Sequence, residues 1–236
     1  MILIQQAYVS ANPQRNAELE WVREANRMSG LFEHIEAVDP GGRRLTFADL
    51  MRMAESTFAG RPCVIANSDI AFDRSIRAVE PLMTDAAGPQ MVVLSRWDDD
   101  TAPSMEGRID QTDWGFYSHS QDAWAFVAGS LPAFEAGFRL GVPACESRLA
   151  FEAAAAGVAV VNPALSIRIR HHHASAIRTW RRSEAYRGPL LFPRLTTTDV
   201  GDRKAFILDR SRWPARKEVV SLLGDFAPLV RRASSP

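Results

Sequence analysis

The sequence has only two cysteines among its 236 residues, Cys63 and Cys145. Two cysteines supply neither a disulfide framework nor the spacing of a cysteine-based metal site, and both stand in apolar surroundings, as small core residues do. The sequence also lacks an apolar run that approaches the roughly 20 residues of a membrane helix, and its first residues lack the charged leader of a signal peptide. These absences favour a cytoplasmic protein, with peripheral contact to a membrane as the alternative.

The chain has no excess of either charge, because 28 basic residues balance 28 acidic ones. The balance is uneven along the chain, since from Arg168 onward there are 15 Lys or Arg against 6 Asp or Glu. A basic C-terminal region can meet phosphates, an anionic glycan or a lipid surface; it can equally be an outer surface that pairs with the acidic remainder. We expect no nucleic acid among the partners.

Predicted strands alternate with predicted helices. Asn12 and Pro13 are suited to open the first helix, and Thr46 with Asp49 three residues later is suited to cap the second. Strands are expected at 2–7, 35–38, 63–66, 91–94, 123–127 and 158–161, and helices at 13–28, 46–59, 74–83, 146–156 and 216–223. The alternation predicts an α/β fold with right-handed crossovers and a Rossmann-like, mostly parallel mixed sheet flanked by helices.

The third predicted strand ends in Asn67-Ser68-Asp69. Ligands of α/β proteins collect at the carboxyl ends of strands, and Asp69 offers the oxygen ligands that a divalent cation takes. Asn67 can add an amide oxygen, and Asp73 is the second-choice carboxylate ligand. A cation held there could carry a diphosphate. In the alternative interpretation Asn67 and Asp69 only cap the next turn, as such residues often do.

A second group of signals follows further along the chain. Glu146 opens an alanine-rich helix, Gly157 ends it, a short buried strand follows at 158–161, and Pro163 then precedes the run His171-His172-His173. This order resembles the C-terminal half of GT-A fold glycosyltransferases, where an acidic residue, a helix with Leu and Arg, the pattern A-G-x-x-V and then P…H succeed one another. The resemblance covers roughly residues 1–175, which we take as a GT-A-like catalytic core, with 176–236 as a basic C-terminal extension packed on it.

The resemblance implies a glycosyltransferase of cell-surface polysaccharide or glycolipid synthesis, which moves a sugar from a nucleotide-sugar donor to a hydroxyl of a glycan or lipid-linked acceptor. Asn67-Ser68-Asp69 then looks like a variant of the family's Asp-x-Asp motif, which binds the metal–diphosphate, with Mn²⁺ or Mg²⁺ as cofactor. A C-terminal histidine completes the metal site in several such families, and alternation along a strand puts His171 and His173 on one face. At the matching position of inverting members an acid acts as general base, here Glu146; Asp122, just before a buried strand, is the competing base.

Further residues are candidates from their positions alone. Arg96, which follows the fourth strand, and Arg178 are expected to bind the donor diphosphate. The spacing of Arg178 and Arg182 suggests that this segment is helical. Trp97 and Asp98, next in the chain, are expected to line the acceptor site, although an aromatic residue is more often part of the core. For Glu146 the alternative role is a helix cap.

Two other classes of protein fit the same residues. The acidic pair and the full Asp-x-Asp of the family are incomplete here, which leaves a glycan- or nucleotide-binding protein without turnover as the leading alternative. A metal-dependent nucleotidyltransferase would also use carboxylates at strand ends. Binding of nucleoside diphosphates or triphosphates, with and without Mn²⁺, distinguishes the three.

Overall fold

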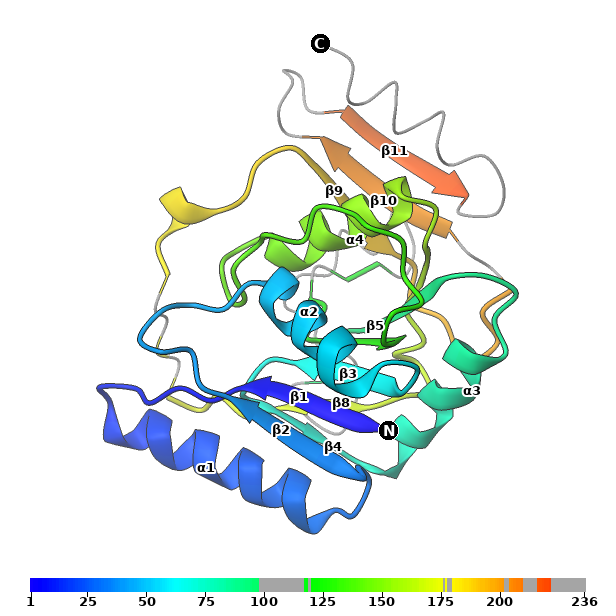
Figure 1. Ribbon diagram of the computed structural model, residues 1–236. Helices are drawn as coiled ribbons and strands as arrows, with labels where there is room; N and C mark the ends of the chain where they lie inside the picture. The colour runs from blue at the N-terminus through cyan, green and yellow to red at the C-terminus, as the bar shows by residue number, and fades with distance from the viewer. Residues whose placement is uncertain are drawn as a thin grey trace.

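The computed structural model describes residues 1–97, 117–118, 120–175, 177, 180–201, 204–209 and 216–221. Its elements follow the chain in this order (Figure 1): β1 Ile2–Gln6, α1 Pro13–Met28, β2 His34–Val38, α2 Phe47–Phe58, β3 Pro62–Ala66, β4 Ile70–Phe72, the 3-10 helix η1 Arg74–Ala78, α3 Val79–Thr84, β5 Gln90–Leu94, β6 Ala123–Val127, α4 Cys145–Ala155, β7 Ala159–Val161, β8 Ile169–His171, the 3-10 turn η2 Arg182–Glu184, β9 Pro189–Pro193, β10 Lys204–Asp209 and β11 Arg216–Ser221.

Within the described residues, six strands form one mixed sheet in the order β2-β1-β3-β6-β5-β7. β2 and β3 both pair in parallel with β1, and β7 pairs in parallel with β5. β6 runs antiparallel to both of its neighbours, β3 and β5. The predicted α/β class and the mostly parallel mixed sheet are therefore confirmed. Because β6 is reversed, it begins at the edge of the sheet where β3 and β5 end.

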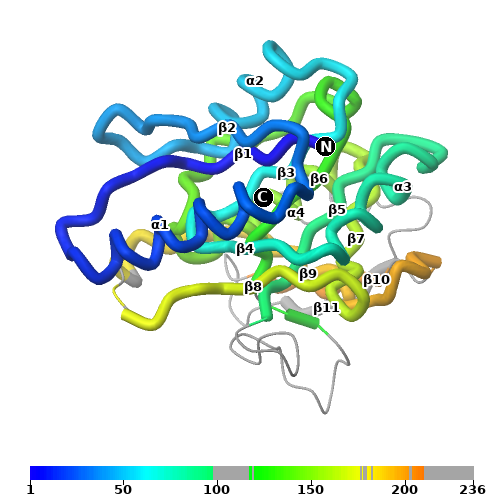
Figure 2. The backbone as a smooth tube through the Cα atoms, turned by 90° about the horizontal axis from the view of Figure 1, so that it is seen from below, coloured from blue at the N-terminus to red at the C-terminus, as the bar shows by residue number. Residues whose placement is uncertain are grey.

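The inner strands β3, β5 and β6 are buried on both faces, so they read as nearly continuous apolar runs, whereas the edge strand β2 has no fully buried residue. In β3, Ile65 faces the core cluster that includes side chains of α2 and α4, whereas Val64 and Ala66 face a second cluster that includes side chains of α3, β4 and β8. Figure 2 shows α2 on one side of β1 and β2, and α1 with the ribbon of β4 and β8 on the other. The helices thus form layers on both faces.

Local signals placed the first two long helices correctly. Asn12 caps α1 by accepting a hydrogen bond from the backbone N–H of Arg15 at 3.0 Å, and Pro13 occupies the first turn. Thr46 and Asp49 form the reciprocal capping box at the start of α2. Each cap satisfies N–H groups that the helix itself leaves without acceptors.

Three helix predictions need correction. The segment 74–83 is split into η1 and α3 instead of one helix; Pro81 lies in the first turn of α3, the part of a helix that tolerates proline. Residues 216–221 form strand β11, antiparallel to β10, instead of a helix, because pairing with the preceding strand decided a segment whose local pattern is ambiguous. The segment around Arg178 is expected to be helical, but its described residues 177, 180 and 181 have no regular structure.

Of the described strands that follow residue 176, β9 and β10 contact the core. β9, β10 and β11 form an antiparallel sheet of three strands within the described residues, and β9 packs against α4. Leu191, Ala205 and Ile207 belong to the same core cluster as the main sheet. Among the described helices we find none with the length and apolar character required to cross a membrane.

Candidate functional site

Polar residues converge where β3 and β5 end and β6 begins. Asn67 follows β3, Arg96 lies just beyond β5, and Asp122 directly precedes β6. Backbone hydrogen bonds continue the sheet through these residues: Asn67 N donates to the carbonyl of Asp122 at 3.0 Å, and Asp122 N donates to the carbonyl of Leu94 at 2.9 Å. The reversed direction of β6 is what brings Asp122 to the same edge as Asn67.

Donors on several sides hold the Asp122 carboxylate. Asn67 Nδ2 donates to Oδ1 at 2.8 Å and Ser120 Oγ donates to Oδ2 at 2.7 Å. Arg96 Nη1 lies 3.7 Å from Oδ1. The Asn67 side chain therefore positions Asp122, while its predicted contact with a diphosphate stays a prediction.

A cleft of about 1630 Å³ opens at this edge of the sheet. One wall comes from the loop before α4 and from Leu190 and Phe192 of β9. The predicted site residues that line the cleft are Asn67, Asp69, Arg96, Asp122, Glu146, His171 and His173. The tertiary structure thus brings the two distant groups of sequence signals into one cavity.

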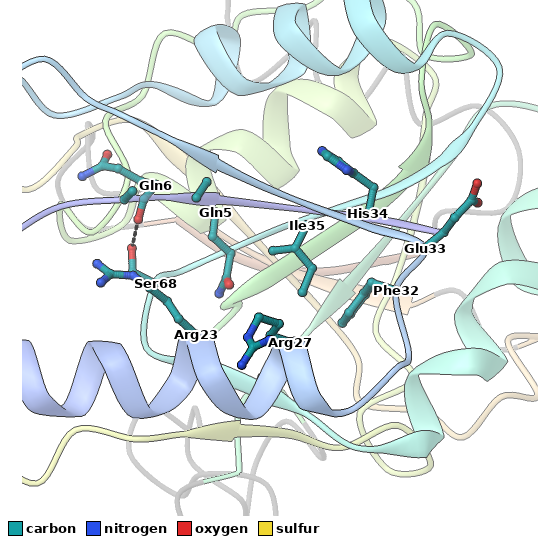
Figure 3. A pocket seen from close by; sticks show the side chains of 11 residues that line it. Gln5, Gln6, Arg23, Arg27, Phe32, Glu33, His34, Ile35 and Ser68 are labelled. Atoms are coloured by element: carbon teal, nitrogen blue, oxygen red, sulfur yellow. Dashed lines mark hydrogen bonds between the residues drawn. The ribbon is translucent and has the colours of Figure 1, made fainter.

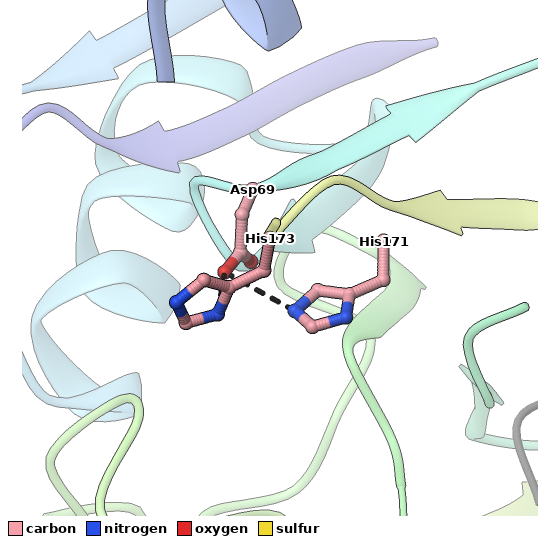
Figure 4. A group of neighbouring side chains, drawn as sticks. All are labelled: Asp69, His171 and His173. Carbon is pink, nitrogen blue, oxygen red and sulfur yellow. Dashed lines mark ion pairs between the residues drawn. The ribbon is translucent and has the colours of Figure 1, made fainter. Parts of the chain in front are cut away.

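Asp69, His171 and His173 form a compact cluster in this cleft (Figure 4). His171 Nε2 lies 3.4 Å and His173 Nδ1 lies 3.7 Å from the same Asp69 oxygen, Oδ2. One ligand atom from each of the three residues lies within 4.8 Å of the others. A carboxylate and two imidazoles in this geometry suit a divalent transition metal with positions left open for other ligands.

Strand pairing explains how the two imidazoles reach Asp69. β8 pairs antiparallel with β4, the short strand that follows Asp69, and His172 N donates to the Asp69 carbonyl at 2.9 Å. Alternation along this extended segment sends His171 and His173 toward the carboxylate, as predicted. His172 points the other way and its ring lies 4.3 Å from the ring of Trp21 on α1.

Two buried charged residues of α1, Arg15 and Glu18, complete the surroundings of the cluster. Arg15 Nη2 donates to Asp69 Oδ2, and Arg15 Nη1 donates to Glu18 Oε2 at 2.9 Å. Burial alone would raise the pKa of Asp69, but the hydrogen bond and charge of His171, together with Arg15, hold it well below its usual range. Sequence reasoning missed both residues, because acidic and basic residues three apart on a helix usually lie on a solvated face.

Glu146 lies in the first turn of α4 and lines the cleft. Burial raises the pKa of Glu146 to about 7, and the negative charge of Asp122 acts in the same direction. A carboxylate that served only as a helix cap would be stabilised by the helix dipole and would have a lowered pKa. Glu146 is instead poised to gain or lose a proton near neutral pH, as a general base or acid must be.

Other predicted site residues are not brought to the cleft or fall outside the description. Asp73 Oδ1 accepts hydrogen bonds from Ser75 N and Ser75 Oγ at the start of η1, so it acts as a cap and is not part of the Asp69 cluster. Trp97 is buried away from the cleft. Asp98 and Arg178 lie outside the described residues.

The surroundings of Trp97 are those of a core residue. Its Nε1 donates to the carbonyl of Ala164 at 3.0 Å, and the guanidinium of Arg168 lies 4.4 Å from its ring centroid. We therefore expect Trp97→Ala to lower the free energy of unfolding by about 3–5 kcal/mol, the usual cost of deleting a large buried aromatic ring. Chemical denaturation measures this directly, and an unchanged midpoint would favour the acceptor-binding role instead.

A second hollow, of about 430 Å³, lies between α1 and the strands β1 and β2 (Figure 3). Arg23 and Arg27 line it, and they already form ion pairs with Glu20 and Glu24 of the same helix. None of the predicted site residues lines this hollow. The titratable groups suited to metal binding or proton transfer line the larger cleft instead.

Comparison with known proteins does not assign the chain to a class of protein, so the class has to be inferred from the residues of the cleft. The sequence matches no model of a protein family, and no curated protein matches it.

Proposed function

We propose that this protein is a GT-A type glycosyltransferase that moves a sugar from a nucleotide-sugar donor to a hydroxyl acceptor with the help of a divalent cation. One observation carries the proposal: a cluster suited to a cation and a carboxyl with a pKa of about 7 line the same cleft, at the edge where strands of an α/β sheet end. The cation would serve the donor diphosphate, and the carboxyl would serve the acceptor hydroxyl as a general base.

The cluster of Asp69, His171 and His173 is the proposed site of the donor diphosphate. A divalent cation bound there would neutralise charge that develops on the diphosphate as it leaves. Arg96 adds a positive charge to the same cleft. Its side chain is 17% exposed, and its position is set by Asp122, whose Oδ1 lies 3.7 Å from Arg96 Nη1. Its guanidinium can donate to phosphate oxygens.

Glu146 is the proposed general base. The acceptor oxygen would attack the anomeric carbon while the bond from that carbon to the diphosphate breaks, and the hydroxyl proton would pass to the Glu146 carboxylate. Asp122 is the less suitable base, because both of its carboxylate oxygens already accept hydrogen bonds, from Asn67 and Ser120. We therefore assign Asp122 a supporting role: its charge raises the pKa of Glu146.

The donor atoms of the cluster favour Mn²⁺ over Mg²⁺. Mg²⁺ prefers oxygen ligands in an octahedral shell, whereas imidazole nitrogen suits the transition metals. We expect Mn²⁺ to bind at least roughly tenfold more tightly than Mg²⁺, measured by calorimetric titration of the protein with each metal alone. His171→Ala should remove this preference, and His172→Ala, whose ring faces Trp21, is the matched control. Equal affinity for the two metals would contradict imidazole ligation.

Nucleotide binding tests the proposed class. Nucleoside diphosphates of the common bases are titrated into the protein with Mn²⁺ and with a chelator. Mn²⁺-dependent binding of a diphosphate supports the transferase, and the base that binds best directs the search for the donor sugar. Binding of triphosphates alone would favour a nucleotidyltransferase, and binding of neither would overturn the proposal.

A further inference from the structure

Helix α1 anchors the segment that carries both imidazoles of the cluster. Ser175, two residues beyond His173, donates its backbone N–H to Glu18 Oε1 at 2.6 Å and its hydroxyl to Glu18 Oε2 at 2.9 Å. The ring of His172 packs against Trp21 of the same helix. The positions of His171 and His173 are thus set by α1 as well as by strand pairing.

Arg15 lies at the centre of this contact. Its side chain is 5% exposed, and it donates to the carbonyl of His172 at 3.3 Å and to Glu18 Oε2 at 2.9 Å. It also donates from Nε to the hydroxyl of Tyr8 at 3.4 Å, and from Nη2 to Asp69 Oδ2, the oxygen that both imidazoles approach. The Arg15 guanidinium is therefore the positively charged partner of the Asp69 carboxylate in this structure.

We propose that Arg15 and a divalent cation compete for Asp69 Oδ2, so that Arg15 is the counter-ion of the cation-free protein and sets the affinity of the site. The inference rests on the cation site of the proposed function. A largely buried carboxylate is stabilised by a charged partner, and two positive partners at one oxygen repel each other more strongly there than in bulk water. Glu18 also forms an ion pair with Arg15, and this second pair weakens the attraction between Arg15 and Asp69.

Direct Mn²⁺ binding tests the competition without substrate or turnover. Calorimetric titration compares the unmodified chain with Arg15→Met, and Arg27→Met is the matched control, an exposed arginine of the same helix whose ion pair is with Glu24. We expect Arg15→Met to bind Mn²⁺ at least tenfold more tightly, and Arg27→Met to bind it unchanged. Equal or weaker binding by Arg15→Met overturns the competition while leaving the cation site in place.

Two further variants keep the test decisive. If Arg15→Met does not fold, Arg15→Gln replaces it: this variant also removes the charge but keeps a polar side chain beside Glu18, and we expect tighter Mn²⁺ binding, so unchanged or weaker binding overturns the proposal. Asp69→Asn should bind no Mn²⁺ in either background. Absence of Mn²⁺ binding from every variant would overturn both the competition and the cation site, whereas nucleotide binding without Mn²⁺ would leave a donor site standing.

Discussion

Replacing Asp69 by asparagine is expected to abolish Mn²⁺-dependent binding of nucleoside diphosphates. Asp69 Oδ2 is the atom that both imidazoles approach and the only carboxylate oxygen for which the described part of the chain shows such a cluster. An amide is neutral and a far poorer ligand than a carboxylate, so the cation loses its charged partner. Calorimetry with Mn²⁺ and a diphosphate measures the loss. Retained Mn²⁺-dependent affinity would show that the cation binds elsewhere.

The same substitution should lower stability without unfolding the chain. Arg15 loses its ion-pair partner in a buried setting, and breaking a buried pair on one side costs about 3–5 kcal/mol. The double variant Arg15→Met with Asp69→Asn removes both charges and should recover part of that stability while still binding no Mn²⁺. Thermal unfolding of the single and double variants separates this effect of charge from the loss of ligand binding.

Replacing Glu146 by glutamine is expected to reduce turnover by roughly a hundredfold or more while donor binding is retained, since a general base contributes on that scale. Gln has nearly the same shape but cannot take the acceptor proton. Turnover and donor affinity are measured on the same variant once a donor is known. Asp122→Asn is measured beside it: a large loss of turnover there, with Glu146→Gln unaffected, would transfer the base role to Asp122.

The pH dependence of stability gives an independent test of Glu146 that needs no substrate. Its pKa is raised from 4.5 to about 7 in the fold, so between these pH values the folded chain keeps a proton that the unfolded chain has released. The contribution of Glu146 to stability therefore falls as pH rises through this window. Glu146→Gln removes the penalty and should be more stable than the unmodified chain at pH 8, by on the order of 2–3 kcal/mol, with little difference at pH 4.

Unfolding at the two pH values also separates the two roles considered for Glu146. A carboxylate that only capped α4 would stabilise the fold in its ionised form, and Gln would then cost about 1 kcal/mol at pH 8. The opposite sign is expected here because burial and Asp122 disfavour the charged form. A stability loss at pH 8 would show that Glu146 is a cap.

Local chemistry in the sequence was enough to determine much of the fold. The cap at Asn12 and the capping box of Thr46 and Asp49 identify helix starts, because these side chains satisfy N–H groups within three residues. Runs of apolar residues identify the inner strands of the sheet, which are buried on both faces. The alternation of His171 and His173 follows from extended backbone alone.

Tertiary structure decided what depends on partners distant in the chain. Trp97 found its hydrogen-bond partner, Ala164, in the core instead of in the cleft. Nearer partners decided two other positions: segment 216–221 pairs with the preceding strand β10, and Asp73 caps η1 through Ser75. No sequence spacing relates Arg15 to Asp69, which are 54 positions apart. The sequence by itself determined α1, α2, α4 and the six strands of the main sheet, and which residue types stand at the ends of those strands. Whether a carboxylate meets an imidazole, a guanidinium or a backbone N–H was decided by packing, because that contact depends on which surfaces the fold buries together.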